Sequence, residues 1–520
     1  MPEGKKNVDA VGWRDLPNKD QLFLLALCRL SEPLSNTCLL PYIFYLIKSI
    51  ASLDDVETSR ISELSGILVA AFPLAQCITS VLWGRLSDSH GRKSIILSGL
   101  FVSALSNLAF GLSKTFGALL FWRILAGLAN GNVGVMRTMT AEIVKEKKYQ
   151  TRAFLLLPLI FNSGMVAALA LGGCLADPVT NLPWLFGPHG WLNFSGNAEG
   201  VAWAAKYPYA LPALFNATVL GLSLLLATLW LRETLEGKDG TPDRGLAIGH
   251  ILTRQLSRLF RRRPHYIAVP LDDLETTVTA NPPPHSKREP SLSTRPPFKA
   301  IWTSPIRTAL LSFTLLPLHN TSFMHILPLY LSTPPSSDLP KPPFLFTGGL
   351  GLHSPSIGIT LASLGICGIL LQLLIYPRLQ SRLKTLGVFR LSLFIFPLVY
   401  AAAPYLSLLA PARGSGLGGP GWLVLGTVVG AQIMARTLAI PSTVVLLTEA
   451  VRDKRVLGTV HGAGAMGAGL ARAVGPAMGG WVFGLGLERG IVGLVWWVWL
   501  GLVAVLALAA SYLMDGEDAE

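Results

Sequence analysis

Between two long apolar segments lies the stretch WGRLSDSHGRK, which runs from Trp83 to Lys93. The flanking segments, 61–82 and 94–112, are each long enough to cross a bilayer, which needs about 20 apolar residues. The stretch is therefore a short turn at one membrane face. Its two glycines, single acid and several bases exceed what an ordinary membrane loop needs. This composition indicates a functional turn and favours a membrane transporter.

Apolar residues dominate the rest of the chain as well. Hydrophobic residues make up 51% and charged residues 14% of its 520 residues, and the mean hydropathy is +0.49. A soluble protein of this length could not bury so much apolar surface. The apolar runs are continuous rather than alternating, which argues against a β-barrel. We predict an all-α membrane protein with twelve transmembrane helices, near 21–47, 61–82, 94–113, 115–143, 153–175, 207–231, 306–331, 356–377, 389–410, 421–448, 457–484 and 490–513.

The net charge of +13 reports orientation rather than a polyanionic partner. If the amino terminus is cytoplasmic, about 31 of the 43 Lys and Arg residues lie on the cytoplasmic side and about 7 lie outside. We therefore expect no nucleic-acid partner and place both termini in the cytoplasm. Because the first twenty residues are polar, we expect no cleavable signal peptide.

The predicted spans fall into two six-helix pseudo-repeats. Short matches, such as Leu40-Pro41 with Leu327-Pro328, keep their order along the two halves. A basic segment of the linker, 251–263, is either an amphipathic helix on anionic lipid or a disordered stretch. The predicted parts are a cytoplasmic tail 1–20, a bundle 21–232, a cytoplasmic linker 233–300, a second bundle 301–513 and an acidic cytoplasmic tail 514–520.

The turn Gly84–Lys93 resembles the loop 2–3 signature of the major facilitator superfamily. With Trp83 it looks like the variant of the zinc-induced-facilitator-like branch and its fungal relatives, although Ser89 stands where that branch usually has a base. The stretch 130–138 looks like the fungal members in particular. The resemblance implies a secondary transporter that works by alternating access. It also implies structural roles for residues of the fourth and eleventh spans, namely Arg123, Gly127, Gly131, Gly475 and Pro476.

One departure leaves the direction of transport open. Antiporters of the superfamily usually carry a Gly-Pro pair in the fifth span, where this chain has Ala168-Leu169. The resemblance favours proton-coupled efflux by antiport of a small organic solute. Proton-coupled symport into the cell remains an alternative. A non-transporting receptor-like or lipid-handling protein of the same fold is a third possibility.

The acid in the turn suggests a conformational latch. Asp88 can bond Arg92 and face the positive N-terminal end of a neighbouring helix, which the resemblance identifies as the helix beginning near Leu457. The alternative is a solvated basic turn that follows the positive-inside rule. The predicted latch consists of Gly84, Asp88, Gly91, Arg92 and Lys93.

Charges inside spans are costly in lipid and usually face a cavity. Arg29, Glu32 and Asn36 share one face of the first span, and the Arg29–Glu32 pair is the candidate for proton coupling or a static ion pair. The resemblance implies that the first, fourth, seventh and tenth spans line the cavity. We expect His319 to be either a cavity residue or a bonded interior histidine. The cavity candidates are Asn36, Asn130, Arg137, His319, Asn320, Gln432 and Arg436, whereas Arg472 and His461 are expected to serve helix packing.

The sequence shows no enzyme, cofactor or metal signature. It has no phosphate-binding loop and no cluster of metal ligands, so we expect neither catalysis nor a cofactor. Asn193-Phe194-Ser195 is a glycosylation sequon on the predicted outer side. We expect a monomer in the vacuolar or plasma membrane, whose partners are a small-molecule substrate, protons and the bilayer.

Overall fold

Helices account for nearly all regular structure in the computed structural model, which describes residues 16–50, 58–194, 196–235, 243–260, 301–336, 339–409, 417–451 and 456–514. Within these ranges only isolated β-bridges occur, and no strand is formed. Eight helical segments are long and apolar enough to cross a membrane: Thr58–Ser80, Arg92–Gly111, Phe116–Ile143, Ala210–Trp230, Ser354–Leu374, Tyr376–Leu409, Gly419–Glu449 and Val495–Tyr512.

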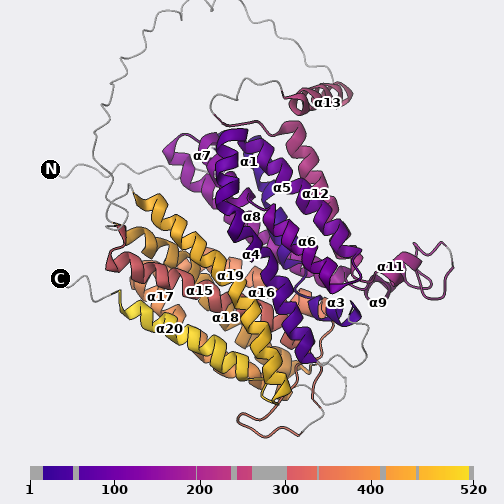
Figure 1. Ribbon diagram of the computed structural model, residues 1–520, viewed down its shortest axis with the longest axis vertical. Coiled ribbons are helices and arrows are strands. Elements are labelled where there is room, and N and C mark those ends of the chain that lie inside the picture. Colours follow the sequence, from indigo (N-terminus) through magenta and orange to yellow (C-terminus); the bar gives the residue numbers. More distant parts are fainter. Residues whose placement is uncertain are drawn as a thin grey trace, which may run out of the picture.

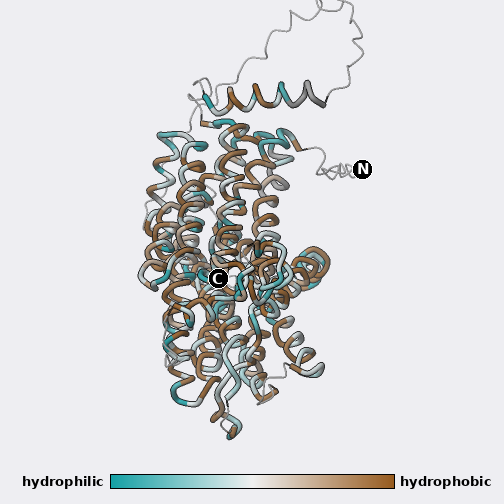
Figure 2. Tube along the Cα trace, turned by 90° about the vertical axis from the view of Figure 1, so that its right-hand side faces the viewer, coloured by the Kyte–Doolittle hydropathy of each residue, from teal (hydrophilic) through white to brown (hydrophobic). Residues whose placement is uncertain are grey.

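The first half of the chain forms one helical body, drawn from indigo to magenta in Figure 1. Its main helices are α1 (Lys19–Arg29), α2 (Ser31–Thr37), α3 (Ile43–Ile50), α4 (Thr58–His90), α5 (Arg92–Gly111), α6 (Phe116–Leu128), α7 (Asn132–Ile143), α8 (Lys147–Leu175) and α12 (Ala210–Trp230). Three short helices, α9 (Pro178–Asn181), α10 (Pro183–Phe186) and α11 (Ala202–Lys206), connect α8 to α12. A further helix, α13 (Arg244–Phe260), crosses the end of this body (Figure 2).

The second half forms the orange and yellow body of Figure 1. It consists of α15 (Ser304–Ser332), α16 (Ser354–Leu374), α17 (Tyr376–Ala402), η3 (Ala403–Leu409), α18 (Gly419–Glu449), α19 (Leu457–Glu488), η5 (Val495–Leu500) and α20 (Gly501–Tyr512). In the linker, the segment 251–263 is helical as far as Phe260, and its last three residues lie outside the described ranges.

Four predicted spans are not uniformly apolar in the structure. The first, 21–47, is divided among α1, α2 and α3, and Pro33 lies beside the break. The fifth, 153–175, contains only the shorter apolar helix Leu159–Leu175. The others are the long helices α15, which contains Pro317 and Pro328, and α19, which is rich in glycine. Of these helices, α8 packs on α16 and α19 packs on α4 of the opposite body, so protein rather than lipid covers part of their surface.

Close backbone contacts join the two bodies at one end of the molecule. Helix α4 packs on α19, and α8 packs on α16. A Cβ atom on Gly358 would lie 2.6 Å from the Leu169 carbonyl oxygen and 3.0 Å from Gly173 Cα, so only glycine allows this approach. Gly66 and Gly480 meet in the same way on α4 and α19. We call this region the sealed end.

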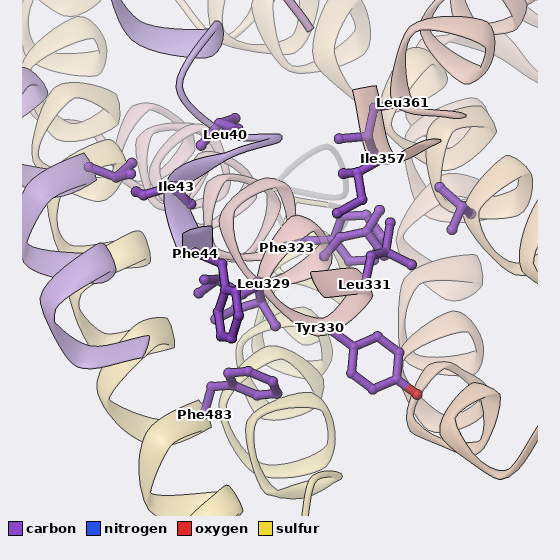
Figure 3. Packing of buried hydrophobic residues seen from close by; sticks show 14 of the residues in the cluster. Leu40, Ile43, Phe44, Phe323, Leu329, Tyr330, Leu331, Ile357, Leu361 and Phe483 are labelled. Atoms are coloured by element: carbon purple, nitrogen blue, oxygen red, sulfur yellow. The ribbon is translucent and has the colours of Figure 1, made fainter. Parts of the chain in front are cut away.

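An apolar core reinforces the sealed end. Figure 3 shows Ile43 and Phe44 of α3 gathered with Leu329 of α15 and Phe483 of α19. These side chains are buried, although they come from both halves of the chain. The hydroxyl of Tyr45 on α3 also donates a hydrogen bond of 2.5 Å to the Leu352 carbonyl oxygen before α16. Apolar burial and a direct hydrogen bond thus hold the two bodies together here.

At the opposite end, which we call the open end, α4 and α19 are no longer in close contact. Cys77 Sγ on α4 lies 4.0 Å from the Met466 carbonyl oxygen on α19. Beyond it, a Cβ atom on Gly84 or Gly462 would meet no atom within 4 Å. The chain therefore adopts a conformation that is closed at one end and parted at the other.

Candidate functional site

A buried ion pair lies where α1 gives way to α2. Leu30 ends α1, and the new helix places Glu32 one turn after Arg29, so that Arg29 Nη1 donates to Glu32 Oε2. The side chains are only 11% and 7% exposed. The Arg29 guanidinium also lies 4.8 Å from the centre of the Phe161 ring on α8. The sequence-predicted pair thus forms, in a site whose burial makes its charge state energetically important.

Further charges surround this pair. Arg137 on α7 and Arg472 on α19 both act electrostatically on Glu32, and both are exposed to solvent. His461 on α19 interacts electrostatically with Arg137. His461 also lies 3.1 Å from Thr448 Oγ1 on α18, a contact between neighbouring helices of the kind expected for it. In the sequence, Arg472 stands out because it is the single arginine of the glycine-rich helix α19.

Arg123 forms hydrogen bonds with two other helices of the first body. Its Nη1 donates to the Ser35 carbonyl oxygen at 2.5 Å, and its Nη2 donates to Asn36 Oδ1 at 2.8 Å. A longer bond of 3.4 Å joins Arg123 Nε to the Leu68 carbonyl oxygen. Asn36, which we expected in the cavity, is thus bonded to Arg123.

A break between α6 and α7 provides the hydrogen-bond partner of Trp83, the first residue of the turn motif. The chain leaves the helix at Ala129, which frees the Leu128 carbonyl oxygen from its intrahelical partner. Trp83 Nε1 donates to this oxygen at 2.6 Å, and Thr79 Oγ1 donates to it at 2.9 Å. The neighbouring Asn130 is buried.

Gly127 and Gly131 of the predicted fourth span also pack against α4. Gly131 lies directly against the Trp83 side chain, and Gly127 lies against the Phe72 carbonyl oxygen. A side chain at either position would collide with α4. Both residues therefore keep α6 and α7 close to α4. In the second body, Gly475 approaches the Leu318 carbonyl oxygen of α15 and thus brings α19, which contains Pro476, against α15.

The polar residues of the second body divide into two groups. Asn320 and Gln432 are buried and joined by a 3.2 Å hydrogen bond. His319 Nδ1 lies 2.8 Å from the Tyr400 hydroxyl and is fully buried, as in the interior alternative. Arg436 instead points between the bodies and contacts Met324 Sδ at 3.7 Å and Met165 Sδ at 3.9 Å.

The turn between α4 and α5 holds its basic residues in bonded positions. Arg92 donates to Asp88, to Ser87 Oγ at 2.8 Å and to Glu142 Oε1 at 3.2 Å. The Glu233 carboxylate accepts from the Arg92 backbone N–H at 2.8 Å and so caps α5. The alternative of a solvated basic turn therefore does not hold for Arg92. Asp88 is 69% exposed and pairs with Arg92 in this conformation.

Gly91 is required by both its backbone and its neighbour. Its φ of 104° lies in the left-handed region, which disfavours other residues. A Cβ atom there would also collide with the Glu233 carboxylate. The glycine lets the chain turn and brings the start of the linker under the motif.

Lys93 ties the motif to the linker helix. Its Nζ donates to Asp243 Oδ2 at 2.6 Å and to the Thr228 carbonyl oxygen at 2.9 Å. Asp243 also accepts from the backbone N–H groups of Gly245 and Leu246, which cap α13. Burial raises the pKa of Asp243, but these hydrogen bonds and the Lys93 charge outweigh it, so the pKa lies below its usual value.

We expect Asp243→Asn to loosen α13. A carboxylate with a lowered pKa stabilises the fold above the pH at which it titrates when unfolded, and loses this effect as pH falls through its folded pKa. The stabilisation is thus complete at pH 7 and declines below about pH 4. Amide hydrogen exchange of 244–260 at pH 7 should rise by about tenfold in the variant, equivalent to about 1.4 kcal/mol of local stability. Unchanged exchange would show that Lys93 does not hold α13.

Asn193, the glycosylation candidate, lies in the connection between α10 and α11. Its Nδ2 donates to the carbonyl oxygens of Pro188 and Asn197, both at 2.8 Å. Modification stays a prediction. Among the described residues, no group of three His, Cys, Asp or Glu side chains could hold a metal ion.

Residues 25–476 match the sequence profile of the Major Facilitator Superfamily. The chain belongs to this family. Its proteins are membrane transporters and not enzymes, as expected from the loop 2–3 signature. The chain is 32% identical to the "Major facilitator superfamily multidrug transporter mfsB" of Aspergillus fumigatus, over 97% of this chain and 85% of that protein.

Two further relatives agree with the resemblance to the zinc-induced-facilitator-like branch and its fungal members. The chain is 25% identical to the "Protein ZINC INDUCED FACILITATOR-LIKE 1" of Arabidopsis thaliana, over 90% of this chain and 85% of that protein. It is 27% identical to the "Efflux pump azaK" of Aspergillus niger, over 95% of this chain and 88% of that protein. The prediction of a multi-pass transporter of this family is confirmed.

Proposed function

We propose that this chain exports a small organic solute in exchange for protons, by alternating access. The observation that carries the proposal is the group of Arg29, Glu32, Arg137 and Arg472, which we call the charged cluster. It lies at the interface of two bodies that are sealed at one end and parted at the other. The relatives printed as a multidrug transporter and an efflux pump support export. The full arrangement is twelve transmembrane helices in two six-helix pseudo-repeats, with both termini cytoplasmic and the protein in the vacuolar or plasma membrane.

The open end is then the cytoplasmic end. The beginning of α1 lies beside the ends of α7 and α12, since Asn18 bonds the Ile143 carbonyl oxygen and Gln21 bonds the Trp230 carbonyl oxygen. The turn motif lies at the same end because Arg92 pairs with Glu142. A cytoplasmic amino terminus therefore places the parted helices toward the cytoplasm, where an exporter loads its substrate.

Glu32 is the proposed proton carrier. When ionised, it holds Arg29 in the buried pair, and when protonated, it releases the guanidinium. Because the positive charges of Arg137 and Arg472 also act on Glu32, a change in its protonation alters the balance of charge between the two bodies. A group that affects both bodies can bias the equilibrium between two conformations.

Asp88 is the proposed latch. In the present conformation it pairs with Arg92 and is exposed, so it is free to approach the N-terminal end of α19 when the open end closes. We expect Asp88→Asn to reduce transport of a fluorescent solute in proteoliposomes by about tenfold, because the closed state loses a charge–dipole contact of about 1 kcal/mol or more.

The control for this experiment is Glu63→Gln, which removes the ion pair with Arg60 from the other end of α4. The control protein should transport at the wild-type rate. Equal rates for Asp88→Asn and Glu63→Gln would refute the latch. A protein that moves neither organic cations nor organic anions, in either direction and at any pH gradient, would refute the transport function.

Proton-coupled symport remains a second candidate because of the sign of the cluster. Arg29, Arg137 and Arg472 give three positive charges around the single carboxylate of Glu32. Protonation of Glu32 would favour binding of an anion, so a proton and an anion would move in the same direction. Reversing the pH gradient across proteoliposomes distinguishes the two, because antiport and symport respond with opposite signs.

A further inference from the structure

Arg436 occupies an unusual position between the two bodies. It lies in the second half of α18, and its guanidinium contacts a methionine from each body. Nη1 is 3.7 Å from Met324 Sδ on α15, and Nη2 is 3.9 Å from Met165 Sδ on α8. A thioether sulfur is a weak acceptor, so these contacts leave the charge largely uncompensated.

Two arginines of the first body, Arg29 and Arg123, have oxygen partners instead. Arg29 is paired with Glu32, and Arg123 donates to three oxygen atoms. In the described part of the chain, no carboxylate lies within salt-bridge distance of Arg436. A cation inside a membrane protein is costly unless an anion accompanies it. The position of Arg436 therefore calls for an anionic ligand.

An apolar strip on α8 connects Arg436 to the charged cluster. Phe161 contacts the Arg29 guanidinium, and Met165 contacts the Arg436 guanidinium. Residues four apart lie on the same face of a helix, so Phe161 and Met165 are neighbours. Cations thus lie at both ends of a surface made of an aromatic ring and a flexible thioether. Methionine adapts its shape to ligands of different form.

The charges at this interface select against a cation. Arg29, Arg137 and Arg472 act on one carboxylate, Glu32, and Arg436 adds a further positive charge between the bodies. An incoming cation would therefore be repelled and an anion attracted. An arginine can bind a carboxylate through two parallel hydrogen bonds. The apolar strip would accommodate the remainder of an amphiphilic molecule.

We propose that Arg436 is the anion-binding residue of the substrate site, and that the substrate class is amphiphilic organic anions that carry a carboxylate. The proposal rests on the proposed transport function, in either direction of coupling. The carboxylate pairs with Arg436, while the apolar part of the molecule lies over Met165 and Phe161. Met324 closes the site from the second body.

The test is equilibrium binding to the full chain in nanodiscs, with carboxyfluorescein as the organic anion and rhodamine 6G as the organic cation. We expect the wild-type protein to bind carboxyfluorescein in preference to rhodamine 6G. Arg436→Gln should weaken carboxyfluorescein binding by about tenfold or more, because a charge-assisted hydrogen-bonded pair is lost. Arg436→Lys keeps the charge but not the two parallel bonds, so its affinity for carboxyfluorescein should lie between those of the wild type and Arg436→Gln.

The matched control is Arg378→Gln, at an exposed position where Nη1 bonds only the Leu374 carbonyl oxygen of its own chain segment. It should bind carboxyfluorescein like the wild type. The proposal is overturned if the wild-type protein does not bind carboxyfluorescein, if it prefers rhodamine 6G, or if Arg436→Gln binds the anion unchanged.

Transport of both dyes by proteoliposomes separates this proposal from the proposed function. Movement of rhodamine 6G without binding of carboxyfluorescein would overturn the anion site and leave the transport function intact. Binding of carboxyfluorescein that depends on Arg436, without movement of either dye, would support the site and refute the transport function.

Discussion

Glu32→Gln is expected to abolish accumulation driven by a pH gradient while leaving exchange of substrate between the two sides intact. Glutamine occupies nearly the same volume but cannot ionise, so the site stays in a state that resembles protonated Glu32. Arg29 then lacks its buried partner at every pH. Substrate can still bind and cross, but no proton moves with each cycle.

The size of the effect follows from the coupling between the two ligands. Coupling free energies between linked sites usually correspond to a factor of about 5–150 in affinity. We therefore expect gradient-driven uptake in proteoliposomes to fall by at least about tenfold. Exchange of labelled for unlabelled substrate, measured at equal pH on both sides, should stay within about twofold of the wild type.

Glu32→Asp provides the control for packing. Aspartate keeps the carboxylate on a shorter side chain, and we expect it to restore part of the gradient-driven uptake. If the Arg29–Glu32 pair is purely structural, the result should differ: the Glu32→Gln protein would lose both folding stability and substrate exchange. Gradient-driven uptake that persists in Glu32→Gln would show that the proton binds elsewhere.

Local sequence patterns predicted much of the fold. Apolar segments of about 20 residues identified helices such as α5 and α12, because hydropathy in a span is set by contact with lipid. The predicted turn from Trp83 to Lys93 is shorter in the structure, because α4 continues to His90 and α5 begins at Arg92, so that only Gly91 lies between them. Helices α15 and α19 deviate from uniform hydropathy, since they pack closely on each other and protein rather than lipid covers part of their surface.

Contacts between distant segments could not be predicted from these patterns. The pairing of Lys93 with Asp243 joins residues 150 positions apart, and the linker gave no sign of it. The same applies to Tyr45 and the Leu352 carbonyl oxygen, which are 307 positions apart. His319 illustrates a different limit: its spacing fitted a cavity residue, but its direction toward Tyr400 depends on how α15 and α17 pack.

Gly358→Leu is expected to prevent closure of the sealed end and so to reduce transport by at least about tenfold. A Cβ atom on this residue would lie 2.6 Å from the Leu169 carbonyl oxygen, and the rest of a leucine side chain has no room between α16 and α8. The backbone of packed helices yields little to such a collision. The two bodies can then separate here but cannot close, which leaves only the conformation with the opposite end shut.

The matched control is Gly426→Leu on α18, where a Cβ atom would meet no atom within 4 Å. This variant should transport normally, because the added side chain occupies open space. Both substitutions place leucine in the interior of a long helix, so they change helix propensity equally.

A reporter cysteine shows which end is open. Ser65 is fully buried at the sealed end, 3.4 Å from His325 Nε2 of the opposite body. Ser65→Cys should therefore be protected from a membrane-impermeant maleimide in an otherwise wild-type background and become labelled in Gly358→Leu. Labelling is read at position 65 by peptide mass spectrometry, because the chain also has free cysteines such as the exposed Cys367. Protection in both backgrounds, together with normal transport, would mean that α8 and α16 need not approach as closely as this structure requires.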